Sequence, residues 1–194
     1  MDKTFLRRKE KVLITAIEVL DESGVNGMTT KEIARRHGIT EPAIYKQYDG
    51  KKEIILAILE QFAVFDIMIK DTIVQRDMGG REGILHFARS YLEYYQNYPQ
   101  IATPLYSFDL YRYDPDTRDL MRRIVQNRQE TLMELVERAQ AAGEISRVLD
   151  QRMLADLLFG AIWSATFIWK LEDGSFDLKD RAIHAVEYLL QCEE

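Results

Sequence analysis

The sequence predicts an all-α protein of about nine helices, with a three-helix N-terminal domain followed by a longer helical domain. Three observations support this fold class. Of 194 residues, 46% are hydrophobic and only 10 are Gly and 4 are Pro, a composition typical of a well-packed chain with few loops. Residues that favour helices dominate, and runs of β-branched residues are scarce. Apolar residues also recur at helical spacing along most of the chain.

The first two helices are predicted from apolar spacing and from their end signals. The first covers the apolar positions between Leu13 and Leu20 and ends near Gly24, because glycine readily adopts the left-handed conformation that ends helices. The second begins at Thr29 or Thr30. Thr29 and Glu32 have the spacing of a capping box, in which the hydroxyl accepts a backbone amide and the carboxylate bonds back.

The third and fourth helices follow after short turns. Thr40 can cap the third helix, and Pro42 is tolerated in its first turn because those amides have no partner within the helix. Asp49-Gly50 ends it. A long fourth helix runs from Lys51 to about Met78, and no Pro- or Gly-rich linker separates it from the preceding helices.

The remaining chain is predicted to be helical in five segments. Breaks at Tyr98-Pro99, Asp114-Pro115, Gly143 and Asp173-Gly174 delimit segments near 82–98, 100–112, 116–142, 150–172 and 178–191. We therefore expect two domains, one over residues 1–50 and one over residues 51–194.

The segment from Thr30 to Tyr48 has the spacing of a helix-turn-helix motif. Ala34 provides the small residue where two helices cross, Gly38 the turn and Ile44 the apolar anchor of the second helix. By spacing alone, an ordinary helical hairpin remains an alternative. The exposed face of the second helix would carry groups able to contact phosphates and base edges, namely Thr40, Ala43, Tyr45, Lys46 and Tyr48.

Charge is distributed unevenly, although the net charge is −6. Residues 1–52 carry eleven Lys and Arg against eight Asp and Glu, a balance of +3. Residues 53–194 carry fifteen against twenty-four, a balance of −9. A basic end on an acidic body is expected when only one module meets phosphate.

Residues 24–59 resemble the N-terminal DNA-binding region of TetR-family transcriptional repressors. The residues that carry the resemblance are Gly24, Thr29-Thr30, Ile33-Ala34, Gly38-Ile39-Thr40, Ile44-Tyr45, Tyr48 and Lys51. The resemblance covers roughly the first 60 residues, and the rest of the chain matches only in length and helical character. Tyr48 replaces the commoner Phe, and Asp49-Gly50 replaces the commoner Pro/Gly-Ser/Asn.

The resemblance implies a homodimeric repressor that binds a near-palindromic, double-stranded DNA operator. It implies contacts to the DNA backbone by Thr30, Tyr45, Tyr48 and Lys51. The residues implied to face the major groove are Thr40, Glu41, Pro42, Ala43 and Lys46. For Glu41 two roles stay open: its carboxylate could accept from cytosine, or it could complement the helix dipole.

The resemblance also implies a pocket for a small-molecule effector in the C-terminal domain. Seven of the ten tyrosines lie between residues 91 and 113, a density compatible with core packing or with an apolar pocket that carries polar groups. The candidate ligand-binding residues are Phe65, Met68, His86, Tyr91, Tyr94, Tyr106 and Trp163.

The last two helices are the predicted dimer interface. The segment from Leu149 to Leu171 is apolar on most faces and must be buried, and a small protein has limited interior for such a helix. A two-fold four-helix interface, which the family uses, would bury it. The candidate interface residues are Leu157, Ala161, Ser164, Ile168, Ile183, Val186 and Leu190.

Other function classes are disfavoured by what the sequence lacks. No signal peptide or membrane-spanning stretch is expected, and the single cysteine, Cys192, favours a reducing, cytoplasmic environment. No HExxH, CxxC, GxSxG or phosphate-loop motif is present, so we expect no enzyme, no cofactor and no metal site. The main alternative is an architectural or protein-recruiting DNA-binding protein without an effector, in which the tyrosines only form a core.

Overall fold

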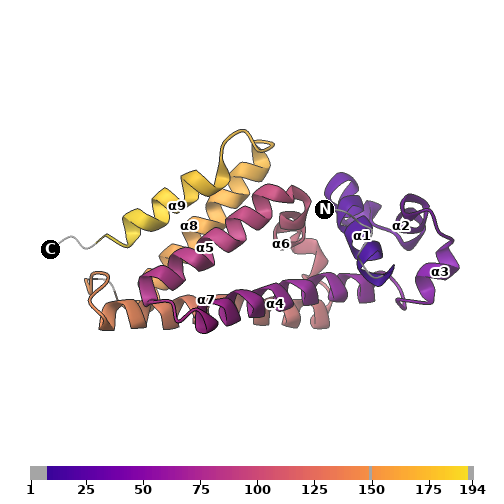
Figure 1. The fold of residues 1–194 in the computed structure, drawn as a ribbon. Helices are drawn as coiled ribbons and strands as arrows, with labels where there is room; N and C mark the ends of the chain where they lie inside the picture. Colours follow the sequence, from indigo (N-terminus) through magenta and orange to yellow (C-terminus); the bar gives the residue numbers. More distant parts are fainter. Residues whose placement is uncertain (1–7, 149, 192–194) are drawn as a thin grey trace. The chain divides into compact units, whose positions relative to one another are not determined.

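The computed structural model describes residues 8–148 and 150–191, and this part of the chain contains nine α-helices and no strand (Figure 1). Cys192 lies outside the described residues. The α-helices are α1 (Arg8–Gly27), α2 (Thr30–His37), α3 (Glu41–Tyr45), α4 (Lys51–Gln75), α5 (Gly80–Asn97), α6 (Thr103–Tyr106), α7 (Pro115–Ala141), α8 (Gln151–Leu171) and α9 (Leu178–Leu189). The all-α fold class is confirmed.

The segment near 100–112 differs from its prediction as a single helix. It forms the 3₁₀ helix η2 (Pro99–Ala102), the single turn α6 and a second 3₁₀ helix, η3 (Phe108–Leu110). Pro99 and Pro104 cannot donate backbone hydrogen bonds, which favours short turns over a continuous helix. Two hydroxyls hold the irregular backbone: Tyr111 donates to the Leu105 carbonyl at 2.9 Å, and Thr117 to the Leu110 carbonyl at 3.1 Å.

The chain packs as two compact units. The first contains residues up to Ala63 together with Gln100–Arg122, and the second contains Val64–Pro99 and the residues from Arg123 onward. Helices α4 and α7 each contribute residues to both units. The boundaries of these packing units differ from the predicted domain boundary between residues 50 and 51. That predicted boundary coincides with the start of α4.

In the first unit, α1 packs against α2 and α6, and α2 packs against α3. The core of this unit includes Ala16, Leu20 and Ile33, all buried, because the apolar faces of the short helices point inward. Gly24 interrupts α1 with a φ of 66°, as its predicted role in ending the first helix requires.

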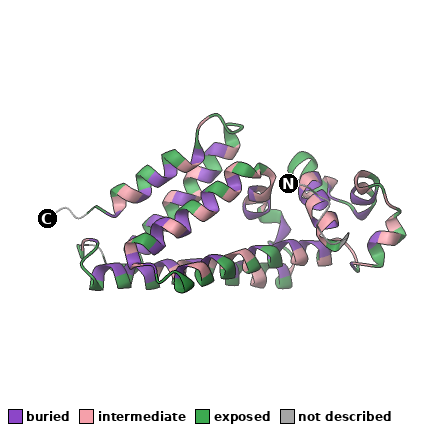
Figure 2. Cartoon of the chain, in the orientation of Figure 1, coloured by how far each residue is buried: buried purple, intermediate pink, exposed green. Residues whose placement is uncertain are grey.

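In the second unit, α5 and α8 both pack against α9, and α5 also contacts α8. Figure 2 shows buried and exposed residues alternating along each of these helices. Helix α8 is long and apolar enough to cross a membrane, but core helices of water-soluble proteins have the same length and hydropathy. About a third of its most apolar window is buried within the chain, which leaves an apolar face exposed.

Candidate nucleic-acid interface

The turn between α2 and α3 has the geometry that a helix-turn-helix motif needs. The Thr29 hydroxyl accepts the Glu32 amide at 3.1 Å, which satisfies one of the free amides at the start of α2. Gly38 ends α2 with a φ of 73° in the left-handed region, as its predicted turn role requires. Ile44 is fully buried and anchors α3 to the core.

Several side chains of α3 face solvent. Tyr45 is 51% exposed, and Lys46, Thr40 and Pro42 are exposed as well, while Ala43 is half-buried. Thr40 takes the N-cap position with an extended backbone but makes no side-chain capping bond, in contrast to its predicted cap role. Its hydroxyl is therefore not used in holding the helix start.

Thr30, Glu41 and Tyr45 form a hydrogen-bonded chain that links α2 to α3. The Thr30 hydroxyl donates to Oε1 of Glu41 at 2.6 Å, and the hydroxyls of Thr30 and Tyr45 lie 3.3 Å apart. Thr30 is buried at the first position of α2. The sequence reasoning placed all three residues at the interface but did not predict that they bond to one another.

Tyr48 is buried and not on the exposed face where the sequence predicted it. Tyr48 and Lys51 both use their polar atoms inside the first unit. The Tyr48 hydroxyl donates to the Lys9 carbonyl at 3.1 Å, and burial together with nearby Glu53 and Glu10 raises the pKa of Tyr48 to about 12. The Lys51 ammonium donates to the Val25 carbonyl, and burial lowers its pKa. A phosphate contact that uses the Tyr48 hydrogen would require Tyr48 to release this bond, whereas the Lys51 ammonium has two further hydrogens to donate.

Glu32 has other partners than the capping box predicts. Its carboxylate accepts from Arg35 at 2.7 and 2.8 Å and from Arg36 at 2.9 Å. Arg36 also pairs with Glu22 at 2.6 Å, which ties α2 to α1. These hydrogen bonds lower the pKa of Glu32 to about 2. Two guanidinium groups outcompete a single backbone amide because both carry charge.

In the second unit, three of the predicted ligand-binding residues form a packed aromatic cluster. The rings of Phe65 and Tyr94 have centroids 4.5 Å apart, and the Phe65 and Tyr91 rings meet edge to face at 5.6 Å. The Tyr91 hydroxyl donates its hydrogen to Asp66 at 2.5 Å, so it cannot donate to a ligand while this bond is in place. Burial raises the pKa of Tyr91.

A buried ion pair lies beneath this cluster. Arg128 of α7 donates two hydrogen bonds of 2.9 Å to the two carboxylate oxygens of Asp66 on α4. The two side chains are only 4% and 13% exposed. The guanidinium also lies 4.5 Å from the Tyr91 ring centroid and 3.4 Å from the Tyr95 hydroxyl, so α4, α5 and α7 meet at one polar centre.

The other predicted ligand-binding residues are dispersed. Met68 is 59% exposed on α4, and the ring of Trp163 on α8 stacks on Phe159 at 5.6 Å. His86 is half-buried, which lowers its pKa. Tyr106 belongs to the first unit, whereas the other six belong to the second.

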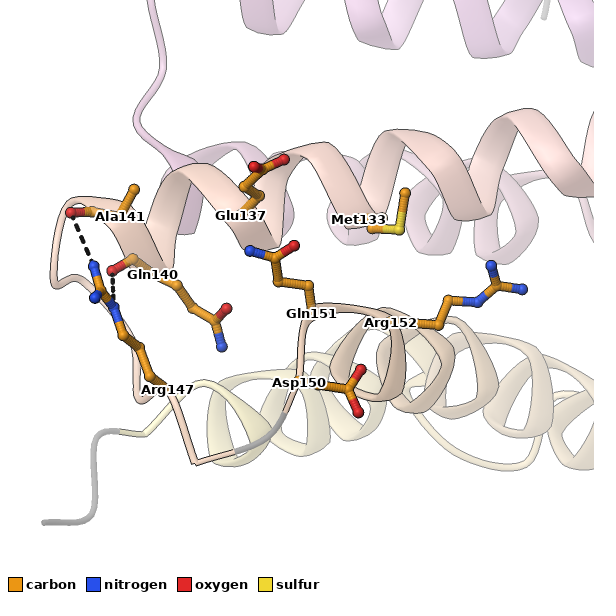
Figure 3. A pocket seen from close by; sticks show the side chains of 8 residues that line it. All are labelled: Met133, Glu137, Gln140, Ala141, Arg147, Asp150, Gln151 and Arg152. Carbon is orange, nitrogen blue, oxygen red and sulfur yellow. Dashed lines mark hydrogen bonds between the residues drawn. The ribbon is translucent and has the colours of Figure 1, made fainter.

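A polar groove in the second unit, about 600 Å³ in volume, was not predicted (Figure 3). It lies between the end of α7 and the start of α8, where the sequence indicated only a break at Gly143. Arg147 crosses one end and donates to the carbonyls of Gln140 and Ala141. None of the seven predicted ligand-binding residues lines it. Its lining residues are Met133, Glu137, Gln140, Ala141, Arg147, Asp150, Gln151 and Arg152.

The predicted dimer residues divide between the two last helices. On α8, Leu157, Ser164 and Ile168 are exposed and Ala161 is half-buried, so this face can meet a second copy. At the other end of the prediction, Ile183 and Val186 on α9 and Leu190 just after it are buried within the protomer, so their place at a two-fold interface stays a prediction. Their apolar stripe packs against the protomer's own helices, since α9 contacts α5 and α8.

Within the described residues, no group of three or more His, Cys, Asp or Glu side chains could hold a metal ion. The candidate nucleic-acid interface consists of the hydroxyl and ammonium groups around α2 and α3.

Two family models match the chain. One, described as bacterial regulatory proteins of the tetR family, matches residues 12–58. The other, described as a tetracyclin repressor-like C-terminal domain, matches residues 81–185, more than half of the chain. Together these two matches cover α2 and α3 and most of the second unit.

Individual relatives match either the N-terminal region or nearly the whole chain. The tetracycline repressor protein class C of Escherichia coli is 36% identical over 53 residues, which is 27% of this chain and 24% of that protein. The fatty acid metabolism regulator protein of Bacillus subtilis is 21% identical over 182 residues, which is 93% of this chain and 92% of that protein.

Solved structures share the fold. The transcriptional regulator FadR of Bacillus subtilis, in complex with stearoyl-CoA, has a TM-score of 0.80 at 18% identity over 95% of this chain and 99% of that one. The regulator MbdR of Azoarcus sp. has a TM-score of 0.81 at 18% identity over 95% and 98%.

Proposed function

Because this chain belongs to the TetR family of bacterial transcriptional regulators, we propose that it is a sequence-specific, cytoplasmic repressor whose operator affinity falls when a small ligand binds. The observation that carries the proposal is the pair α2 and α3, joined at the left-handed Gly38 with Tyr45 and Lys46 on the exposed face of α3.

The proposed DNA contacts follow from the chemistry of these side chains. Lys46 can donate to guanine acceptors, and the Pro42 ring or the Ala43 methyl can pack on thymine methyls, while Thr40 lies beside them. Thr30, Tyr45, Tyr48 and Lys51 are proposed to contact phosphate oxygens, and the operator affinity should fall steeply as salt rises.

Dimerisation would place two copies of α3 on two half-sites of a near-palindromic operator. The exposed apolar residues of α8 support this proposal, because they need a partner surface to bury them. We therefore propose a two-fold interface centred on Leu157, Ala161, Ser164 and Ile168.

For the effector we propose a mainly apolar or aromatic molecule that binds in the second unit. The structural neighbour bound to stearoyl-CoA supports a ligand with a long apolar part. The contacts would come from ring faces and apolar side chains such as Phe65, Met68, Tyr94 and Trp163, since the Tyr91 hydroxyl is held by Asp66.

The proposed link between the two events is α4. This helix begins at Lys51 in the first unit and ends in the second. A ligand that binds better when α4 is displaced would weaken operator binding by about 5- to 150-fold, the range of typical allosteric couplings. Linkage requires the reciprocal effect: saturating operator should weaken ligand binding by the same factor.

The first experiment selects duplexes from a random DNA pool with the purified protein at low salt. Enrichment of a near-palindromic sequence supports the proposal. A protein that retains no duplex above the non-specific background would show that it does not read DNA sequence.

A second candidate function is a DNA-binding protein without a small-molecule effector. The packed cluster of Phe65, Tyr91 and Tyr94 above the Asp66–Arg128 pair favours it, because a filled core leaves no role for the tyrosines in ligand binding. Native mass spectrometry of the purified protein separates the two: a co-purified small molecule supports the repressor with an effector.

A further inference from the structure

We propose that Glu41 does not read a base but restrains the two hydroxyl groups of Thr30 and Tyr45, and so weakens binding to every duplex. The proposal rests on the DNA-binding function proposed above and concerns the role of Glu41 within it. This role differs from the two that the sequence left open for Glu41, which were accepting from cytosine and complementing the helix dipole.

The direction of each hydrogen bond follows from the number of hydrogens. A hydroxyl carries one hydrogen, and the Thr30 hydroxyl donates it to Oε1 of Glu41 at 2.6 Å. The 3.3 Å contact between Tyr45 and Thr30 therefore uses the hydrogen of Tyr45. The chain runs from Tyr45 through Thr30 to the carboxylate, and both hydrogens are already used.

Phosphate oxygens only accept hydrogen bonds at neutral pH. To donate to a phosphate, Thr30 or Tyr45 must therefore release the acceptor that it now has. The bond from Thr30 to Glu41 is short and its acceptor is charged, so it is the harder one to release. The carboxylate of Glu41 also adds a negative charge close to these two donors. Both effects oppose backbone contact whatever the base sequence is.

The same geometry disfavours base reading by Glu41. One carboxylate oxygen faces Thr30, which is buried at the start of α2, and Glu41 itself is half-buried. A carboxylate that accepts from cytosine has to extend into the major groove, away from this partner. Lys46, exposed on the same helix, has no such constraint.

The experiment is a double-mutant cycle on DNA affinity with Glu41→Ala, Thr30→Val and the double variant. The probes are the duplex selected by the wild type and a shuffled duplex of equal length. Glu41→Ala should bind both duplexes about 3- to 10-fold more tightly, a change that corresponds to one net hydrogen bond. In the Thr30→Val background this gain should fall to about twofold or less, because no Thr30 donor remains to be released.

Two controls separate the restraint from a simple charge effect. Glu41→Gln keeps an acceptor for Thr30 and should give a smaller gain than Glu41→Ala. Asp49→Asn removes an exposed negative charge of the same domain, and its effect should be equal with and without Thr30→Val. Thermal melts check that each variant folds, and Thr30→Ala, which also removes the Thr30 donor, serves as a second background if Thr30→Val does not fold.

Three results would overturn the proposal: no gain for Glu41→Ala, an equal gain in both backgrounds, or a changed selected sequence at one base position. The last result would assign base reading to Glu41. If the wild type itself selects no sequence, the DNA-binding function fails instead, so the two failures are distinguishable.

Discussion

At the scale of single residues, side chains around α2 and α3 differ in whether they are free for DNA or already used within the protein. Lys46 is exposed, whereas the ammonium of Lys51 donates to the Val25 carbonyl and the Tyr48 hydroxyl to the Lys9 carbonyl. A substitution at a residue whose polar atoms bond within the protein changes both stability and DNA affinity. A binding measurement alone does not separate these two effects.

Lys46→Met and Lys51→Met form a matched pair that tests this difference. Lys46→Met should lower operator affinity and leave the thermal midpoint unchanged, because its ammonium is solvated. Lys51→Met should lower both, since it also removes the bond to Val25. Calorimetry and a DNA titration measure the two quantities. An unchanged thermal midpoint for Lys51→Met would show that the internal bond is not stabilising.

Glu32 predicts a pH dependence of stability. Arg35 and Arg36 lower its pKa from 4.5 to about 2, so the folded state favours the ionised carboxylate. A group with a lowered folded pKa contributes stability above its unfolded pKa and loses that contribution as pH falls through the folded value. The wild type should therefore lose stability between about pH 4.5 and 2.

The matched variant is Glu32→Gln, which cannot ionise. Its thermal midpoint should be lower than that of the wild type at pH 7, and it should change less between pH 4.5 and 2. Melting curves across this range measure the difference. Parallel curves for the two proteins would contradict a role for the Glu32 carboxylate in acid stability.

At the scale of elements, the buried pair of Asp66 and Arg128 joins α4 to α7, and Tyr91 and Tyr95 bring in α5. Ion pairs of this kind contribute little net stability relative to apolar packing, but breaking one leaves an uncompensated buried charge. The main effect of the pair is therefore to select one arrangement of the three helices, and its net contribution to stability is small.

Asp66→Asn should destabilise the protein by about 3–5 kcal/mol, because Arg128 keeps its charge without a counterion. The control is Lys70→Gln, which removes the exposed pair with Glu134, a 2.8 Å contact between the same two helices. It should cost about 1 kcal/mol or less. Denaturant unfolding compares the two variants, and equal losses would contradict the importance of burial.

For the molecule as a whole, the exposed apolar face of α8 is the surface proposed to meet a second copy. Leu157, Phe167, Ile168 and Leu171 are exposed on this helix, whereas Ile183 and Val186 of α9 are inside the protomer. Exposed apolar residues grouped on one helix favour an interface over a solvated surface.

Leu157→Glu should convert the proposed dimer to a monomer and weaken operator binding, since one chain can occupy only one half-site. Val74→Glu is the control: it places the same charge on an exposed apolar residue of α4. Light scattering after size exclusion gives the mass of each variant. A Leu157→Glu protein that stays dimeric would place the interface elsewhere.

The helices and the turn between α2 and α3 could be predicted from the amino-acid sequence, because they depend on residues close together in the chain. The spacing of Leu13 and Leu20, the cap at Thr29 and the left-handed positions of Gly24 and Gly38 are local features with local causes. The one failure among the elements, the segment near 100–112, lies where prolines and hydroxyl contacts replace helical bonds.

Which polar groups bond to one another depends on how distant parts of the chain pack, and the sequence did not predict it. Asp66 and Arg128 are 62 residues apart in the chain, and Thr30 and Glu41 lie on different helices, so no local pattern pairs them. The same holds for Val186. Its position in the apolar stripe of the last helix fits an interface and a core equally well, and in the structure it is buried in the core. Helical periodicity identifies which face of a helix is apolar, but the partner of that face is chosen by how the whole chain packs.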